Sequence, residues 1–190
     1  MTKPVQKRAL QTRSKLLNAA RKIVSAHGYS ALRVEQVVLD AGVAKGTFFA
    51  HFQDKDAMME IIVGNEIDAL LSRAEVLTPP DSLSAFVAQV SPIMGFMTSE
   101  RYIFDLIIRH SGAAAKEDIG PIAVTFGRQI ELFAKWLSQG PFRKDVPVSV
   151  LSEGVQALAV QCMALNFCAI NSEETMESRF GTYLEAWLLR

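Results

Sequence analysis

The sequence predicts an all-α protein of about nine helices, and three observations support this prediction. Apolar residues recur at helical spacing in each segment between breaks that contain glycine or proline. No segment shows a convincing strand pattern. The first third of the chain also contains two short amphipathic segments around a glycine, which is the pattern of a helix-turn-helix. We therefore expect an N-terminal three-helix helix-turn-helix domain, followed by a C-terminal helical domain.

The N-terminal part is divided by two glycines. Residues 1–8 have the composition of a loose basic arm. Gly28 follows the first helix as a natural C-terminal cap, and Gly42 stops the second. The helices expected in this part lie at about residues 10–26, 33–41, 44–49 and 54–74.

The clearest break in the chain is "LTPPDS" at residues 77–82, where two prolines interrupt the helical pattern. A second loop, "SQGPFRKDVP", covers residues 138–147. Between and after these breaks the pattern is amphipathic and helical. The helices expected here lie at about residues 82–98, 100–112, 119–139, 148–169 and 173–189.

The charged residues are distributed unevenly, although the 190 residues carry no formal net charge. Residues 1–60 hold ten Lys/Arg against five Asp/Glu, a balance of +5. Residues 61–190 hold ten against fifteen, a balance of −5. This asymmetry favours an anionic partner for the basic end, with a chance surface distribution as the alternative.

The composition also predicts the compartment and the class of protein. Cys162 and Cys168 lie in an apolar run and are expected to be reduced core residues rather than a disulfide. The N-terminus lacks the apolar segment of a secretory signal, and no apolar run reaches the ~18 residues that span a membrane. We expect a cytoplasmic protein. Because no phosphate loop, metal-ligand spacing or nucleophile elbow occurs, we expect no enzyme, no cofactor and no metal site.

The segment "AGVAKGTFFAHFQDK", residues 41–55, combines apolar and basic residues around a Gly-Val turn. At about 100° per residue, Ala44, Phe48 and Phe52 fall on one side of a helix, so Phe48 and Phe52 are predicted to be core. The opposite side carries Gly46, Thr47, Phe49 and Ala50. These small and mostly uncharged groups would let the helix approach the major groove of DNA closely.

Three residues around this helix could contact DNA. Lys45 stands at its N-terminal end, where helix-turn-helix proteins meet base edges. His51 and Lys55 flank it and can reach phosphates. The alternatives are that the lysines are only solvated, that His51 is a half-buried structural histidine, and that Thr47 only helps to start the helix.

The segment from about Thr12 to Glu60 resembles the N-terminal domain of the TetR family of transcriptional regulators. Its residues "LLNAARKIVSAHGYSALRVEQVVLDAGVAKGTFFAHFQDKDAM" contain a first helix ending in "HGY", then "AGV.KGT", an aromatic pair, "HF" and an acidic-Lys start to the fourth helix. The resemblance covers about a quarter of the chain, and the remainder matches only in helix count. It implies three groups of DNA-contacting residues: Lys45, Gly46, Thr47 and Phe49 at bases or the adjacent backbone, His51 and Lys55 at phosphates, and Arg33 and Glu35 at the DNA edge.

Several positions depart from the family pattern. Phe49 replaces a usual tyrosine, which removes a phenolic hydrogen bond to phosphate. Ala44 and Arg33 stand where serine or threonine often caps a helix, and an absent cap costs about 1 kcal/mol. Glu35 stands where a base-reading arginine is common, and its carboxylate repels phosphate but can accept from a cytosine amino group. These departures change which operator sequence the protein is expected to read, and they leave the expected mode of DNA binding unchanged.

The resemblance also implies a ligand pocket between the C-terminal helices, for an apolar or amphipathic small molecule that alters DNA affinity. Pro92 and Gly95 are expected to kink the helix over 82–98 and to open space within it. For the aromatic and apolar candidates, packing in the core is the alternative. The candidate ligand-binding residues are Phe96, Tyr102, Phe104, Arg109, His110, Phe126, Trp136, Asn166 and Phe167.

The last two helices carry broad apolar faces, which suggest burial against a partner. A two-fold dimer through a four-helix bundle fits, and it resembles the way the family dimerises. The candidate interface residues are Leu151, Val155, Leu158, Cys162, Phe180, Tyr183, Leu184 and Trp187.

These expectations combine into one functional hypothesis. Residues 1–8 form a flexible basic arm, residues 9–56 the helix-turn-helix DNA-binding domain, and residues 57–190 the ligand-binding and dimerisation domain. We expect a homodimeric transcriptional regulator, with a repressor favoured by the resemblance, that binds a palindromic operator and is released by a small molecule. The alternative is a protein–protein adaptor that kept the fold but lost DNA binding.

Overall fold

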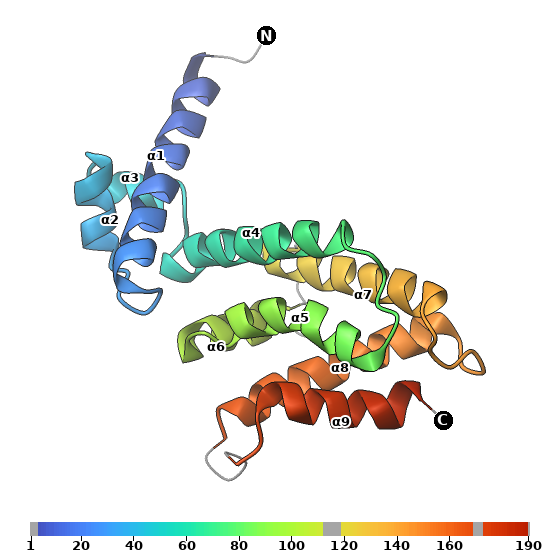
Figure 1. Ribbon diagram of the computed structural model, residues 1–190. Helices are drawn as coiled ribbons and strands as arrows, with labels where there is room; N and C mark the ends of the chain where they lie inside the picture. The colour runs from blue at the N-terminus through green and yellow to red at the C-terminus, as the bar shows by residue number, and fades with distance from the viewer. Residues whose placement is uncertain (1–3, 112–118, 169–172, 190) are drawn as a thin grey trace. The chain divides into compact units, whose positions relative to one another are not determined.

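The computed structural model describes residues 4–111, 119–168 and 173–189, and within these ranges the chain forms nine α-helices and no strand (Figure 1). The prediction of an all-α fold is confirmed. The helices are α1 (Pro4–His27), α2 (Val34–Ala41), α3 (Lys45–Phe49), α4 (Lys55–Glu75), α5 (Leu83–Met97), α6 (Arg101–His110), α7 (Pro121–Gln139), α8 (Val148–Asn166) and α9 (Met176–Leu188).

The largest difference from the expected boundaries is at the N-terminus. The helix α1 begins at Pro4 rather than near residue 10, so residues 4–8 of the expected loose arm belong to a helix. Proline is favoured at the first helical position because its missing N–H has no partner there in any case. Residues 1–3 lie outside the described residues, and the other helix ends lie within three residues of those expected.

The described chain divides into two compact units, one ending at Val63 and one beginning at Gly64. The first unit packs α1, α2 and α3 with the first part of α4. Its buried apolar side chains come from all four helices and include Leu16, Ile23, Val37, Phe48, Met58 and Ile62. Burial of these faces is what holds two helices as short as α2 and α3 in place, because isolated helices of this length are unstable in water.

Two glycines set the turns of the first unit, as expected. Gly28 and Gly42 both have positive φ, at 84° and 66°, where other residues are strained. After α2 the N–H of Gly42 donates to the carbonyl of Leu39, and the N–H of Val43 donates to that of Val38. These bonds satisfy carbonyls at the end of α2 and turn the chain towards α3.

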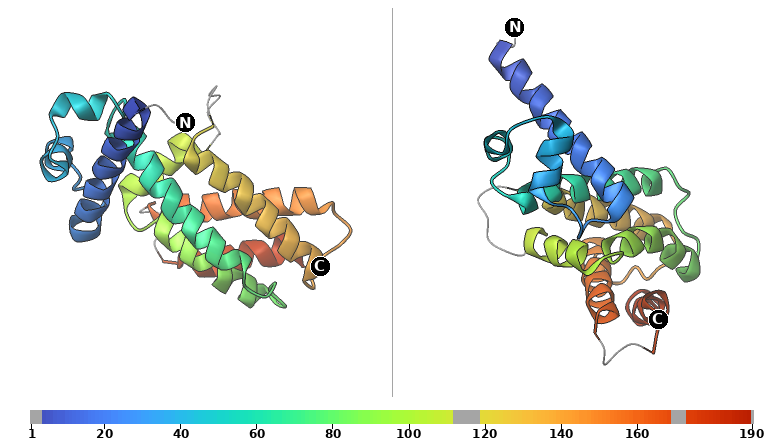
Figure 2. Two further views of the ribbon diagram at one scale, coloured as in Figure 1. Left: turned by 90° about the horizontal axis from the view of Figure 1, so that it is seen from above. Right: turned by 90° about the vertical axis from the view of Figure 1, so that its left-hand side faces the viewer.

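The second unit packs α8 against α7 and α9, and α5 against α9 (Figures 1 and 2). An aromatic cluster fills the interior beside these helices. Phe86 of α5 lies 5.7 Å from Phe133, 5.5 Å from Trp136 and 5.7 Å from Phe142 between ring centroids. Trp136 has no accessible surface. The helix α5 continues through Pro92 and Gly95 as far as Met97.

One helix in the described part, α8, is long and apolar enough to cross a membrane by length and composition alone. The sequence of α8 is not one continuous apolar run, because Glu153 and several small and polar residues interrupt it. In the structure α8 packs between α7 and α9. A core helix of a water-soluble protein has the same composition, so this helix is weak grounds for a membrane span.

Candidate nucleic-acid interface

Two phenylalanines anchor the third helix to the first unit. Phe48 is fully buried and Phe52 is 4 % exposed, which confirms that both are core residues. Their ring centroids lie 5.4 Å apart, and the guanidinium of Arg13 lies 4.7 Å from the ring of Phe52. The contact of Arg13 with Phe52 ties α1 to the residues that follow α3, and the burial of Phe48 leaves the opposite side of α3 facing outwards.

The outward side of α3 is open and nearly free of bulky groups. A methyl group added at Gly46 would meet no atom within 4 Å, and Phe49 is 51 % exposed. Thr47 is partly exposed between them. Phe49 is a contact candidate because its exposed ring stands on the open side of α3, next to Gly46 and Thr47.

Ala44 does not belong to the buried side on which the helical wheel placed it. It is exposed, and it stands before α3 with extended backbone angles, φ −71° and ψ 151°. The 100° rule of the wheel applies only inside a helix, and α3 begins one residue later. Ala44 supplies no side-chain cap, as its replacement of serine implies.

The structure brings Glu35 and Lys45 together, a contact that the sequence analysis did not foresee. The Nζ of Lys45 donates to Oε1 of Glu35 at 2.6 Å, and the two side chains are 57 % and 67 % exposed. The hydrogen bond from Lys45 lowers the pKa of Glu35 below its ordinary value, helped by the charge of Lys45. The pair joins the first turn of α2 to the first residue of α3.

Arg33 is positioned by its own turn. It precedes α2 as the N-cap residue without a side-chain cap bond. Its Nη1 donates to the carbonyl of Ser30 at 2.8 Å and to that of Leu32 at 3.0 Å. The guanidinium is therefore held beside the start of α2, although the residue is exposed.

The remaining two predicted phosphate-contacting residues flank α3. His51 is half-buried just after the helix, and Lys55 is the first residue of α4 and is partly exposed. Asp54, which the sequence analysis did not use, caps α4 by accepting from the N–H of Ala57 at 2.8 Å. The start of α4 thus carries a carboxylate next to Lys55.

Much of the positive excess of residues 1–60 lies on α1. This helix contains no acidic residue, and five of its basic side chains are exposed. They are Lys7, Arg8, Lys15, Arg21 and Lys22. The sequence analysis counted this charge but did not place it on one helix, because it took residues 1–8 as a loose arm.

The structure does not gather the nine candidate ligand residues into one pocket. Trp136 belongs to the aromatic cluster with Phe86, so core packing describes it, and Phe104 and Phe126 are also buried. The rings of Phe104 and Phe167 lie 5.3 Å apart, with Arg101 5.4 Å from the ring of Phe167. Arg109 and Asn166 are exposed, whereas Phe96, Tyr102 and His110 are half-buried.

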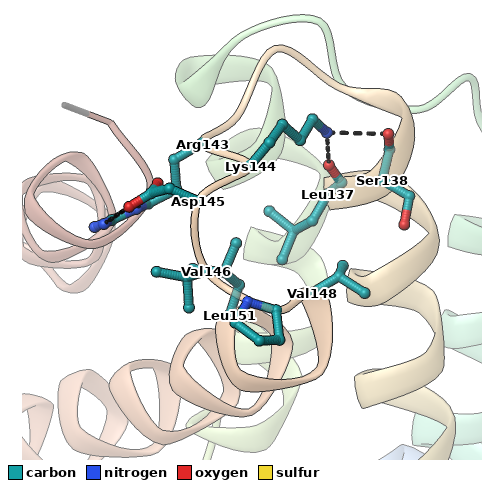
Figure 3. Close-up of a pocket in the computed structure, with 9 residues that line it drawn as sticks. Leu137, Ser138, Arg143, Lys144, Asp145, Val146, Val148 and Leu151 are labelled. Atoms are coloured by element: carbon teal, nitrogen blue, oxygen red, sulfur yellow. Dashed lines mark hydrogen bonds and ion pairs between the residues drawn. The ribbon is translucent and has the colours of Figure 1, made fainter.

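A hollow of about 530 Å³ lies where α7 turns into α8, and none of the nine candidates lines it (Figure 3). Lys144 lines this hollow, and its Nζ donates to the carbonyls of Leu137 and Ser138 at the end of α7, at 2.6 and 3.0 Å. Arg143 is paired with Asp145. The charged side chains here stabilise the end of α7 and the loop, which is a structural role.

Gln129 of α7 is a residue that the sequence analysis missed. It is 4 % exposed among apolar neighbours, and its Nε2 has no hydrogen-bond partner within the described residues. A buried amide donor without a partner costs free energy, so it is a candidate to meet a bound group. No group of three or more His, Cys, Asp and Glu that could hold a metal ion occurs in the described part of the chain.

Most candidate dimer residues are buried within the chain itself, and the predicted interface stays a prediction. Five of the eight are buried against neighbouring helices of the same chain: Leu151, Val155, Cys162, Phe180 and Leu184. The apolar faces of α8 and α9 are covered by each other and by α5 and α7. Leu158, Tyr183 and Trp187 remain partly exposed. Neither cysteine forms a disulfide, in agreement with the sequence.

In the first unit, the short helices α2 and α3 are joined by a tight turn at Gly42, which is the arrangement of a helix-turn-helix. Residues 16–62 match the family model described as bacterial regulatory proteins, tetR family. A 69-residue stretch is 30 % identical to the HTH-type transcriptional regulator UidR of Escherichia coli (strain K12), covering 36 % of this chain and 35 % of that protein. The match thus spans about a third of the length of this curated relative.

Solved structures resemble the chain over nearly its full length. One is RolR in complex with the ligand resorcinol, with a TM-score of 0.70 and 15 % identity over 97 % of this chain and 91 % of that one. Another is the TetR-family transcriptional repressor FadR of Thermus thermophilus in complex with lauroyl-CoA, with a TM-score of 0.65 and 15 % identity over 92 % of each chain. At these identities the likeness concerns the fold. Together with the sequence match of the first unit, it supports a regulator of the TetR family.

Proposed function

We propose that this protein is a transcriptional regulator that binds double-stranded DNA through the outward side of α2 and α3. The observation that carries the proposal is the exposed surface of Gly46, Thr47 and Phe49 on a helix whose other side is anchored by Phe48. Such a helix can enter the major groove without moving the core. His51 and Lys55 flank it at phosphate-contacting positions, and Arg33 lies beside the start of α2.

The family adds a two-fold arrangement to this proposal. A palindromic operator presents two half-sites about 34–36 Å apart or at a multiple of that spacing, and a symmetric dimer matches it. The partly exposed side chains Leu158, Tyr183 and Trp187 are the members of the predicted interface that a second copy can reach. We therefore place the dimer contact on the outer faces of α8 and α9.

A ligand that releases the operator completes the proposal. The neighbours RolR and FadR were solved with resorcinol, which is aromatic, and with lauroyl-CoA, which carries an aliphatic acyl chain on coenzyme A. In this chain the unpartnered amide of Gln129 and the half-buried Phe96, Tyr102 and His110 are the groups that such a molecule could meet. A differential affinity of a few kcal/mol between two states of the dimer is enough to shift DNA binding strongly. The family resemblance favours a repressor, in which release by the ligand relieves repression.

The proposal is tested by fluorescence-anisotropy binding to DNA from upstream of the protein's own gene, at about 50 and 200 mM salt. Phosphate contacts make the affinity fall steeply with salt. We expect tight, sequence-selective binding by the native chain, weaker binding by Lys45→Ala, and no change in Lys135→Ala. Lys135 is the matched control because it is an exposed lysine of the second unit.

The adaptor alternative makes the opposite prediction. An adaptor that lost DNA binding would show weak affinity at low salt, equal for random and upstream DNA. If the protein does not bind the upstream DNA selectively, selection from a random DNA library separates a regulator from an adaptor. A recovered consensus would support a regulator with its operator elsewhere, and a library without enrichment would support the adaptor.

A further inference from the structure

The contact between Glu35 and Lys45 stands at the place where the proposed regulator meets base edges. The two side chains come from the first turn of α2 and the first residue of α3, and they meet across the turn at 2.6 Å. More than half of each side chain is exposed. An exposed pair of this kind contributes little to folding stability, so its placement calls for another explanation.

The pair keeps hydrogen-bonding capacity for a partner. A carboxylate has two acceptor oxygens and an ammonium group has three donors, so one bond between them leaves acceptors on Glu35 and donors on Lys45. The lowered pKa of Glu35 keeps the carboxylate ionised at neutral pH. The pair therefore presents an acceptor and a donor side by side, in a geometry that each partner fixes for the other.

The major-groove edge of a G·C base pair is complementary to this arrangement. Guanine offers the acceptors N7 and O6, and cytosine offers its N4 amino donor next to them. Lysine binds the guanine acceptors, and glutamate accepts from the cytosine amino group. In an A·T pair the adenine N6 amino donor stands where guanine has O6, and thymine presents its O4 acceptor and methyl group where cytosine has its amino group. A carboxylate held at the cytosine position would lose its hydrogen bond there, and the methyl group would remove water from it.

We propose that Glu35 and Lys45 act as one reading unit that requires a G·C base pair in each half-site of the operator. Lys45 donates to the guanine and Glu35 accepts from the cytosine of the same pair. On an A·T pair the carboxylate of Glu35 faces the thymine O4 acceptor in place of the cytosine amino donor, and it repels the nearby phosphates. The pair thus favours the operator and weakens binding to random DNA. This inference rests on the proposed function.

The surroundings of the pair support a joint role. The guanidinium of Arg33 is held by the carbonyls of Ser30 and Leu32, and Gly46 has no side chain. Neither therefore competes with the pair for a base edge at the start of α3. Because each charge neutralises the other, Lys45 attracts phosphate less than an unpaired lysine would.

The test is selection from a random DNA library with the full chain, followed by affinity measurements on the recovered sequence and on copies with single base-pair changes. For the native protein we expect one G·C pair per half-site whose change to A·T weakens binding by about tenfold. In Glu35→Gln we expect this discrimination to fall to about twofold or less, because glutamine keeps the shape but loses the charge. We also expect Glu35→Gln to bind random DNA more tightly.

Asp40→Asn is the matched control. Asp40 is an exposed acid of the same helix α2, and its carboxylate accepts from Gln36 at 2.6 Å rather than from Lys45. Its substitution changes the net charge by the same amount. We expect random-DNA affinity to rise slightly and the G·C discrimination to stay as in the native protein. Lys45→Gln combined with Glu35→Gln should lose no more discrimination than either change alone, because the pair acts as a unit.

The possible failures are distinguishable. A library in which the native chain enriches no sequence overturns the proposed function itself. A native consensus whose G·C discrimination persists in Glu35→Gln overturns the inference alone, and leaves Glu35 as a charge that only screens Lys45. Equal effects of Glu35→Gln and Asp40→Asn on every sequence would also overturn it. Both residues are exposed, and unchanged melting temperatures would confirm that the variants fold.

Discussion

The two units of the chain differ in what their apolar residues do. In the first unit, one phenylalanine of the pair at 48 and 49 is buried and the other is half-exposed at the candidate interface. In the second unit, five of eight candidate dimer residues and three of nine candidate ligand residues are buried in the chain's own core. Burial in the chain's own core is therefore compatible with the candidate residue of the first unit and restricts the candidates of the second.

The reason for the difference is physical. Helical periodicity says which side of a helix is buried, but not whether the neighbour belongs to the same chain or to a partner. The faces of α8 and α9 are covered by each other and by α5 and α7. Only the side chains at the margins of these faces, such as Tyr183 and Trp187, keep some exposure. Four predictions test this contrast, from the largest expected effect to the smallest.

The first prediction separates a core residue from an exposed residue of the same candidate ligand set. Trp136→Ala should reduce the free energy of unfolding by about 3–5 kcal/mol, because it empties the space between Phe86 and Phe133. Arg109→Ala should change it by less than about 0.5 kcal/mol, because Arg109 is exposed. Urea unfolding of both variants gives the two values. Equal effects would mean that the aromatic cluster is not the core of the second unit.

The second prediction uses two glycines inside helices of the second unit. A methyl group at Gly154 would lie 2.4 Å from ring atoms of Trp187, whereas one at Gly127 would meet nothing within 4 Å. Gly154→Ala should destabilise the chain by about 1–3 kcal/mol through this clash between α8 and α9. Gly127→Ala should stabilise it by up to about 1 kcal/mol, because alanine favours the helix. Melting temperatures should move in opposite directions, and a shared direction would contradict the α8–α9 packing.

The third prediction concerns helix caps, which differ from helix to helix along the chain. The hydroxyl of Thr175 caps α9 by accepting from the N–H of Ser178, whereas α2 and α3 have no side-chain cap. Thr175→Ala should cost about 1 kcal/mol, and Thr175→Ser should cost less because it keeps the hydroxyl. The free energies of unfolding of the two variants provide the comparison. If serine and alanine were equally harmful, the lost methyl group and not the cap would be responsible.

The fourth prediction concerns pH and the cysteines. Burial raises the pKa of Cys162 to about 11 from its ordinary value of 9.0. The unfolded thiol therefore ionises at lower pH than the folded one, so the contribution of Cys162 to stability is complete below about pH 9 and is lost as the pH rises towards 11. Stability in this range should fall less in Cys162→Ala than in the native chain.

Thiol labelling checks the same environment. At pH 8 a thiol reagent should modify the half-buried Cys168 and leave Cys162 unmodified in the folded protein. Modification of Cys162 at an equal rate would contradict its burial between α8 and its neighbours.

The sequence was sufficient for the helices and for the turns of the first unit. Gly28 and Gly42 adopt the positive φ that their positions implied, and Phe48 and Phe52 are buried on the predicted side. It was not sufficient for contacts between residues of different helices. Glu35 and Lys45 are ten positions apart in the sequence, and their contact depends on the angle between α2 and α3. The unpartnered amide of Gln129 likewise becomes visible only when its neighbours are placed.

The measurement that tests the central claim most directly is lysine footprinting in the presence and absence of bound DNA. Lysines are acetylated in the folded protein, and mass spectrometry then gives the extent of modification at each position. The account predicts that DNA protects Lys45 and Lys55, and that Lys135 and Lys144 of the second unit are modified equally in both states. Protection of Lys135 and Lys144, with Lys45 and Lys55 unchanged, would contradict the claim that the outward side of α2 and α3 is the DNA-binding surface.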